Sequence, residues 1–240
     1  MKYSFTIETD KTEVLEAALR RVKTRHELSD ALGAPSRALR EYASDVLEKV
    51  AESQVELLVD FADAIIDALE RPEVFTRANI LEILDRMVAR HAAIVSKAIA
   101  QLEDCLYDED SKIVRLEAFA VLAHLGATTQ ARSRTSWEYL SEALRCYHGD
   151  PEYPMMLNYL SEMLGSAKVA DDVREGVVNL FIFDAEQGKG MVQKRAQQIV
   201  ELCPGCLKKV KAQRAREAAK READEIARAQ ALAEDFDDLD

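Results

Sequence analysis

Residues Asp108–Gly126 read DEDSKIVRLEAFAVLAHLG, and this stretch carries the main signal for the architecture. It begins with three acidic residues, and the hydroxyl of the following Ser111 can accept from the free N–H groups of a helix start. Apolar residues then recur at steps of three and four, the period of a helix with one buried face, and Gly126 closes the pattern. The stretch therefore predicts an acidic turn and an amphipathic helix with apolar positions at Ile113, Val114, Ala118, Val121, Leu122 and Leu125.

The pattern recurs at a nearly constant spacing. Three segments align without gaps, and each carries an arginine at one shared position, at intervals of 37 and 38 residues. Two later units fit less regularly, because Leu157 and Gln193 stand where the arginine is expected. The sequence predicts five such helices, beginning near Ser36, Glu73, Ser111, Pro154 and Gly190, with the shared arginines at Arg40, Arg77 and Arg115.

A partner segment of about one helix length precedes each of the last four of these helices. The links within the pairs are short and are acidic or marked by proline or glycine. A unit of two helices cannot bury its apolar faces alone, so such units are expected to stack into a curved solenoid. The partner segments contain Val55–Ala68, Val95–Leu106, Trp137–Leu144 and Val173–Phe183.

An acidic turn, an arginine early in a helix and an Ala/Leu stripe at this period resemble one unit of the HEAT-repeat family. The resemblance implies an all-α fold, a curved α-α superhelix of about five helix pairs. In that family the arginine commonly bonds an aspartate in a turn and joins neighbouring repeats. Here Arg115 with Asp108 or Asp110 fits that role, and Arg40 and Arg77 belong to the same ladder.

The chain is expected to have four parts. Residues 1–9 alternate polar and apolar side chains, which predicts an extended arm lying over the first helices or a strand that pairs with another chain. Residues 10–206 form the repeat domain. Residues 207–231 are a highly charged helix with few large apolar side chains, and residues 232–240 are an acidic tip expected to be disordered or to dock on a partner.

Charge and hydropathy exclude several classes of protein. The net charge of −12 opposes non-specific attraction to nucleic acid or to anionic membranes. No apolar run reaches the length of about 20 residues that a membrane helix needs, and the N-terminus shows no signal peptide. The cytoplasm is the expected location.

No arrangement of residues predicts catalysis, a cofactor or a metal. Cys203-Pro-Gly-Cys206 lacks the second ligand pair of a tetrahedral zinc site, and Cys203 is expected at a helix end rather than at the helix start that activates a thiol. A turn with one buried cysteine is the simpler reading, and whether this pair binds metal stays open. Cys105 and Cys146 fall on apolar stripes and are expected to be buried.

Two alternatives involve nucleic acid. Residues 25–43 also resemble a helix-turn-helix, with Gly33 in the turn and Arg37 and Arg40 able to face DNA, and the basic helix 208–228 offers a second route. The chain also resembles the AlkD-type DNA glycosylases in being a short solenoid. No motif of that family can be matched to it residue by residue, and its acidity has the wrong sign for a DNA channel.

In the HEAT family the second helix of each pair lines the concave face. Positions two, five and eight residues after the shared arginine are the best candidates to leave the core, and carboxylates recur there on at least three helices. The sequence therefore predicts a non-enzymatic scaffold or adaptor that binds a protein partner, with a basic segment, along an acidic concave face. The predicted contact residues are Tyr42, Asp45, Glu48, Asn79, Glu82, Asp85, Glu117, Tyr159 and Glu162.

Overall fold

The computed structural model describes the backbone of residues 3–237 and the side chains of residues 3–228. Helices and turns account for the described backbone, and it contains no strand. The predicted all-α repeat architecture is therefore confirmed. The chain divides into two compact units, Met1–Ala170 and Asp171–Asp240, and the repeat domain expected over residues 10–206 stays a prediction.

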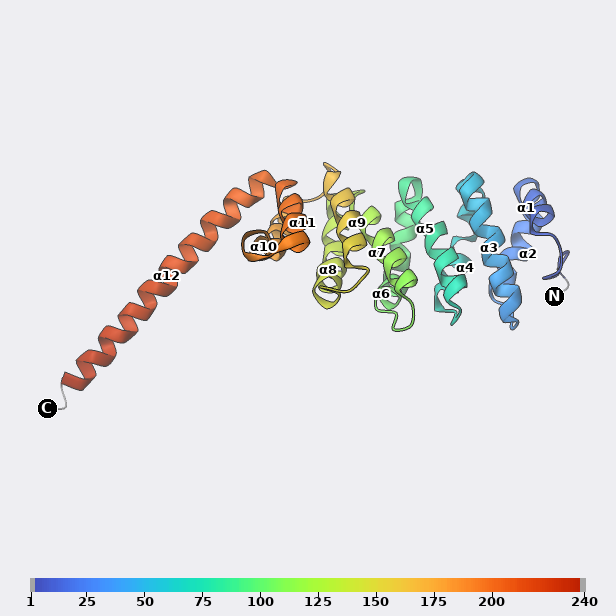
Figure 1. Cartoon of the computed structure of the whole chain (residues 1–240). Coiled ribbons are helices and arrows are strands. Elements are labelled where there is room, and N and C mark those ends of the chain that lie inside the picture. The colour runs from blue at the N-terminus through green and yellow to red at the C-terminus, as the bar shows by residue number, and fades with distance from the viewer. Residues whose placement is uncertain (1–2, 238–240) are drawn as a thin grey trace. The chain divides into compact units, whose positions relative to one another are not determined.

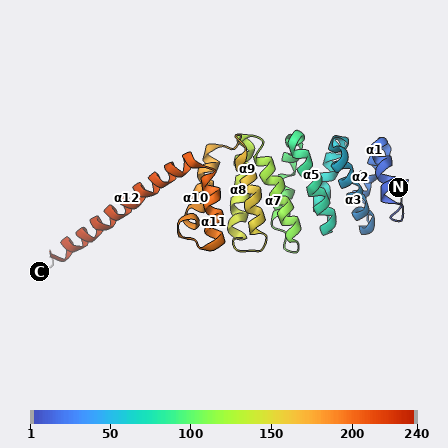
Figure 2. The same cartoon turned by 45° about the horizontal axis from the view of Figure 1, so that its top comes forward.

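The first unit is a row of paired helices. Within it the helices stand side by side in the order of the sequence (Figures 1 and 2). It contains α1 (Lys11–Arg20), α2 (Val22–Leu32), α3 (Arg37–Gln54), α4 (Ala62–Asp67), α5 (Val74–Val95), α6 (Ile99–Leu106), α7 (Lys112–Gly126), α8 (Gln130–Cys146) and α9 (Tyr153–Gly165). Short 3-10 segments, Val55–Phe61, Ala68–Glu70 and Ser96–Ala98, extend the first helices of two pairs.

The second helices of the pairs, α3, α5, α7 and α9, each pack directly on the next. In the apolar column predicted from the repeat, Leu47, Leu84 and Leu122 are all fully buried. Burial of such a leucine stabilises the fold by about 1.5–3 kcal/mol.

The N-terminal segment forms turns rather than a strand, and it covers the first repeat. Phe5 is buried and stacks on Tyr42 of α3, with ring centroids 5.6 Å apart. The Tyr42 hydroxyl donates a hydrogen bond to the carbonyl of Thr9 at 2.9 Å. Of the two arrangements expected for residues 1–9, residues 3–9 adopt the one that lies over the first helices; residues 1–2 are outside the described part.

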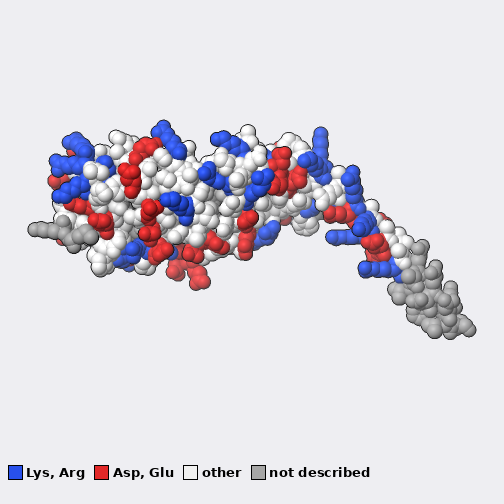
Figure 3. Space-filling view, turned by 180° about the vertical axis from the view of Figure 1, so that it is seen from behind, with Lys and Arg blue, Asp and Glu red and all other residues white. Residues whose placement is uncertain are grey.

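The second unit contains α10 (Asp171–Gln187), α11 (Gly190–Glu201) and α12 (Pro204–Asp237). Helices α10 and α11 form a pair, and α12 begins against both of them. Lysine, arginine and acidic side chains follow one another along the described part of α12 (Figure 3). Helix α12 continues to Asp237, and residues 238–240 lie outside the described part; the acidic tip expected over residues 232–240 stays a prediction.

Among the described residues, no helix combines the length and the apolar character that crossing a membrane requires.

Candidate functional site

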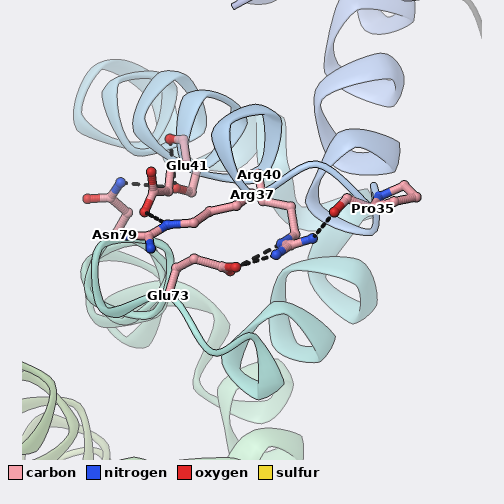
Figure 4. Close-up of polar contacts among 7 residues, drawn as sticks. Pro35, Arg37, Arg40, Glu41, Glu73 and Asn79 are labelled. Carbon is pink, nitrogen blue, oxygen red and sulfur yellow. Dashed lines mark hydrogen bonds and ion pairs between the residues drawn. The ribbon is translucent and has the colours of Figure 1, made fainter. Parts of the chain in front are cut away.

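The shared arginines link each repeat to the next. Arg40 reaches from α3 to Glu73 at the start of α5, where its Nε donates at 3.1 Å (Figure 4). Its Nη1 donates to the carbonyl of Ala34 at 2.6 Å. The Glu73 side chain is only 3% exposed, and the hydrogen bond from Arg40 is the main cause that holds its carboxyl pKa below the usual value. Arg40 is thus a link between repeats.

Arg77 and Arg115 repeat this arrangement, with one correction. Arg77 pairs with the carboxylate of Asp108 at 2.6 Å in the following turn. Arg115 donates to the backbone carbonyl of Asp108 at 2.7 Å, but its carboxylate partner is Glu152. The expected pairing of Arg115 with the side chain of Asp108 or Asp110 is wrong, because each arginine reaches forward to the next repeat. Burial is the largest single influence on the Glu152 pKa and raises it, but the hydrogen bonds from Arg115 and from its own backbone, together with the charges of Arg115 and Lys112, keep the pKa below its usual value.

Hydrogen bonds between successive second helices hold these helices in a constant register. Arg86 and His124 both lie nine residues after the shared arginine of their helix. Arg86 donates to Glu48 of the preceding helix at 3.1 Å, and Nδ1 of His124 lies 2.5 Å from Asp85, which occupies the same position as Glu48 one repeat later. The register inferred from the sequence therefore describes real rows of side chains across α3, α5, α7 and α9.

The outward side of these helices is the candidate site, which we term the second-helix face. Residues at spacings of three, four or seven lie on one side of a helix, and Phe75, Asn79 and Glu82 of α5 have this spacing. Met155, Tyr159 and Glu162 of α9 have the same one. The second-helix face comprises Ala38, Asp45, Phe75, Asn79, Glu82, Asp85, Ile113, Glu117, His124, Met155, Tyr159 and Glu162.

The structure leaves seven of the nine predicted contact residues at least partly accessible. Tyr42 is buried because the N-terminal segment covers it. Glu48 is buried because its position turns toward the α3–α5 contact, where Arg86 and Lys49 pair with it. Both predictions of an exposed contact are wrong. The accessible seven are Asp45, Asn79, Glu82, Asp85, Glu117, Tyr159 and Glu162.

Two carboxylates on adjacent helices are poorly compensated. Burial raises the pKa of Glu117, and the negative charges of Glu82 and Asp85 raise it further. Burial likewise raises the pKa of Glu82, with a smaller effect from Glu48. Among the described residues, Glu117 has no lysine, arginine or histidine within ion-pair distance. The charge of His124 lowers the pKa of Glu117 only as the smallest of these influences, so an added positive charge near Glu117 would favour its charged form.

A row of basic side chains borders the carboxylates. This row was not predicted from the sequence. Lys49, Arg86 and His124 all stand nine residues after the shared arginine. Arg86 also approaches Glu82 at 3.7 Å, and at the N-terminal end Lys11 pairs with Asp45 at 2.7 Å. The recurrence of Lys, Arg and His at this one position was the available signal. The face is thus an acidic row beside a basic one rather than a uniformly negative groove.

His124 ties three second helices together. Its Nδ1 lies 2.5 Å from Asp85 of α5, and its Nε2 lies 3.1 Å from Glu162 of α9. The hydrogen bond to Asp85 is the main cause that raises the His124 pKa to about 9, so the imidazole is cationic at neutral pH. The ring of Tyr159 meets that of His124 edge-on, with centroids 5.9 Å apart.

The helix-turn-helix alternative meets a structural obstacle. Residues 25–43 do form two helices joined by a turn, but α3 packs against both α2 and α5. Arg40 is occupied by Glu73, and Arg37 turns to Glu41 of its own helix (Figure 4). The expectation that Arg40 faces DNA is therefore wrong. The basic helix 208–228 is largely exposed on α12, and nucleic-acid binding there stays a prediction.

The Cys203–Cys206 segment lies at a helix start as well as a helix end. Cys203 follows the end of α11, as expected, but Leu207 N–H also donates to the Cys203 carbonyl at 2.9 Å, so Cys203 caps α12 as well. Both cysteines are buried, and burial is the main cause that raises the pKa of each thiol. Such thiols are poor nucleophiles at neutral pH. Cys105 is buried as expected, whereas Cys146 is exposed.

Comparison with known proteins identifies an architecture. No protein-family profile matches the chain, and no curated protein sequence matches it. A computationally designed armadillo repeat protein for modular peptide recognition is 15% identical, with a TM-score of 0.62 over 80% of this chain and 91% of that one. An archaeal HEAT-like repeats protein from Thermococcus onnurineus NA1 is 14% identical, with a TM-score of 0.52 over 84% of this chain and 95% of that one.

A third similar structure is a designed armadillo repeat protein in complex with the peptide (KR)4. It is 14% identical, with a TM-score of 0.62 over 80% of this chain and 91% of that chain. At these identities the likeness concerns the fold alone. The chain therefore has the HEAT-like, all-α solenoid architecture that its repeat pattern predicts.

Proposed function

We propose that this protein is a non-enzymatic interaction scaffold that binds a basic segment of a partner protein on the second-helix face. The observation that carries the proposal is Glu117, a half-buried carboxylate beside Glu82 and Asp85 whose pKa is raised by burial and by its neighbours. The free protein gains nothing from this unfavourable charge. A lysine or arginine of a partner would stabilise the charged form of Glu117, and this stabilisation would contribute to the affinity of the complex.

Two further features support a basic partner. The accessible carboxylates stand on four consecutive second helices, so an extended segment laid across them meets a carboxylate at successive repeats. One structural neighbour, the designed armadillo protein, was solved with the alternating basic peptide (KR)4. That protein shows what this architecture can bind, and the carboxylates supply the reason for expecting it here.

The test is a binding measurement with a probe of known composition. Fluorescence anisotropy of labelled (KR)4 would be titrated with the full chain and with Glu82→Gln/Glu117→Gln. Each lost charge-assisted contact is worth about 1.5–3 kcal/mol, so we expect binding at least about tenfold weaker and less dependent on salt. The variant should unfold at an equal or higher temperature, because it removes repulsion from the free protein.

A matched control comes from the first helices. Asp67, Asp104 and Glu138 are exposed carboxylates on α4, α6 and α8. Neutralising two of them, Asp104→Asn/Glu138→Gln, changes the net charge by the same amount as the test variant. If this control weakens binding as much as the test variant, the attraction is non-specific and the second-helix face is not the site.

A further inference from the structure

Exposed large apolar side chains are concentrated in one line on the first unit. Phe75 is 68% exposed, Ile113 51% and Met155 44%. Each stands two residues before the position of the shared arginine, on α5, α7 and α9 respectively. Single exposed apolar residues are ordinary, but a contiguous set marks a contact surface. We term Phe75, Ile113 and Met155 the apolar row.

The apolar row belongs to the second-helix face. Phe75 lies four residues before Asn79 and seven before Glu82, Ile113 lies four before Glu117, and the spacing in α9 is the same. At 1.5 Å per residue along a helix, the apolar row and the carboxylates are therefore about 6–10 Å apart. The pairs Arg77–Asp108 and Arg115–Glu152 link the starts of these helices, so the equivalent positions Phe75, Ile113 and Met155 recur from one repeat to the next.

A hollow lies where the row reaches α3. Its volume is about 380 Å³, and it is lined by Ile7, Ala38, Phe75, Asp45 and Asn79 among others. Ala38 occupies on α3 the position that larger side chains occupy on the following helices. Ile7 of the N-terminal segment is 52% exposed and also lines the hollow, so it adds apolar surface at this point. The hollow has room for one large apolar side chain beside the Asp45 carboxylate.

From these observations we infer that the partner segment is extended and alternates basic with apolar side chains. This inference rests on the proposed function and specifies its ligand. Successive side chains of an extended chain point to opposite sides. A segment laid between the two rows would place its lysines and arginines on the carboxylates and its apolar side chains on Phe75, Ile113 and Met155. The carboxylates complement the basic side chains of the segment. The apolar row supplies apolar contact area that a purely basic peptide leaves unused.

The experiment compares two peptides of equal charge on the full chain. In one, arginine alternates with leucine over eight residues; in the other, arginine alternates with serine. We expect the Arg-Leu peptide to bind at least about tenfold more tightly, since covering one apolar side chain is worth about 1.5–3 kcal/mol before ordering costs. The Phe75→Ser/Ile113→Ser/Met155→Ser variant should lose this advantage and keep its affinity for the Arg-Ser peptide. These side chains are exposed, so the variant should retain its helical circular dichroism.

Four outcomes separate the possibilities. If both peptides bind the unaltered chain equally, the apolar row is not used and this inference is overturned, while the proposed function stands. If neither binds, both are overturned. Val22, 53% exposed on α2 and outside the row, gives the control Val22→Ser, and an equal loss there would show unspecific adsorption. If sedimentation shows a dimer that the triple variant dissociates, the row is covered by a second copy of this chain and the assignment to another protein is wrong.

Discussion

Two ionisable side chains on α7 show how one acidic environment acts in opposite directions. Glu117 is half-buried beside Glu82 and Asp85, and its pKa is raised because its charged form is unfavourable there. The pKa of His124, two turns further along α7, is also raised, but for the reverse reason: its charged form is stabilised by the hydrogen bond to Asp85. The protein thus pairs Asp85 and Glu162 internally through His124, whereas Glu117 forms no ion pair among the described residues.

The role of His124 predicts a dependence of stability on pH. Its folded-state pKa is about 9, above the value near 6.5 of an unfolded histidine. The stabilisation is therefore complete below pH 6.5 and is lost as the pH rises through about 9. Between pH 6 and pH 9.5, the free energy of unfolding of the unaltered chain should fall by about 1–2 kcal/mol more than that of His124→Gln, a figure reduced for partial exposure of the ring.

Urea unfolding at both pH values would measure this difference. The control is His148→Gln, which alters an exposed histidine outside the cluster. Equal pH dependence in the unaltered chain and in His124→Gln would show that the bridge between Asp85 and Glu162 contributes nothing to stability.

Single positions on the face could be read from the sequence only in part. The spacing after each shared arginine correctly left Asn79, Glu82 and Glu117 outside the core. It failed for Tyr42, because covering that ring depends on where a segment 33 residues earlier, ending at Thr9, comes to lie. It also overlooked His124, since one histidine among four is unremarkable until Asp85 and Glu162 are brought to it by packing.

At the scale of helix pairs, the ion pairs of the shared arginines are the packing interaction that the sequence repeat predicts. The period predicted which arginines share a role, but the partner carboxylate differs in type and position, being Glu73, Asp108 and Glu152 in turn. No fixed spacing identifies it, because loops of different length separate the paired helices. What is constant is the geometry: each guanidinium reaches forward to a nearly buried carboxylate in the next repeat.

This geometry predicts a large effect of removing one member of a link. Arg115→Met leaves the Glu152 carboxylate, which is 5% exposed, without its partner, and should destabilise the protein by about 3–5 kcal/mol. The double variant Arg115→Met/Glu152→Met removes the stranded charge and should regain most of that loss. Thermal or urea unfolding would measure both.

Arg37 provides the comparison within the same set of interactions. Its side chain is 70% exposed and pairs with Glu41 of its own helix, so Arg37→Met should cost less than about 1 kcal/mol. If Arg37→Met and Arg115→Met are equally destabilising, the links between repeats have no special weight in holding the solenoid together.

Considered as a whole chain, the repeat period was sufficient to predict the architecture, because stacking of two-helix units is the way such units bury their apolar faces. It did not predict the division after Ala170, since the fourth and fifth units lack the shared arginine and their register is weaker. The absence of that arginine at Leu157 and Gln193 is the feature of the sequence that could have indicated this division. A ladder link requires the arginine, so the regular series of links ends with Arg115 and Glu152.

The division gives a prediction about where binding resides. Every residue of the second-helix face, from Ala38 to Glu162, lies in Met1–Ala170, whereas the basic helix 208–228 lies in Asp171–Asp240. The fragment 1–170 retains the contacts among α3, α5, α7 and α9, so we expect helical circular dichroism and cooperative unfolding.

This fragment should bind the Arg-Leu peptide within about threefold of the full chain, a difference below 1 kcal/mol. Because removing residues 171–240 also removes the positive charges of 208–228, any competition from that helix for the acidic row would appear as tighter binding by the fragment. A folded fragment that binds more than tenfold more weakly would place part of the site beyond residue 170.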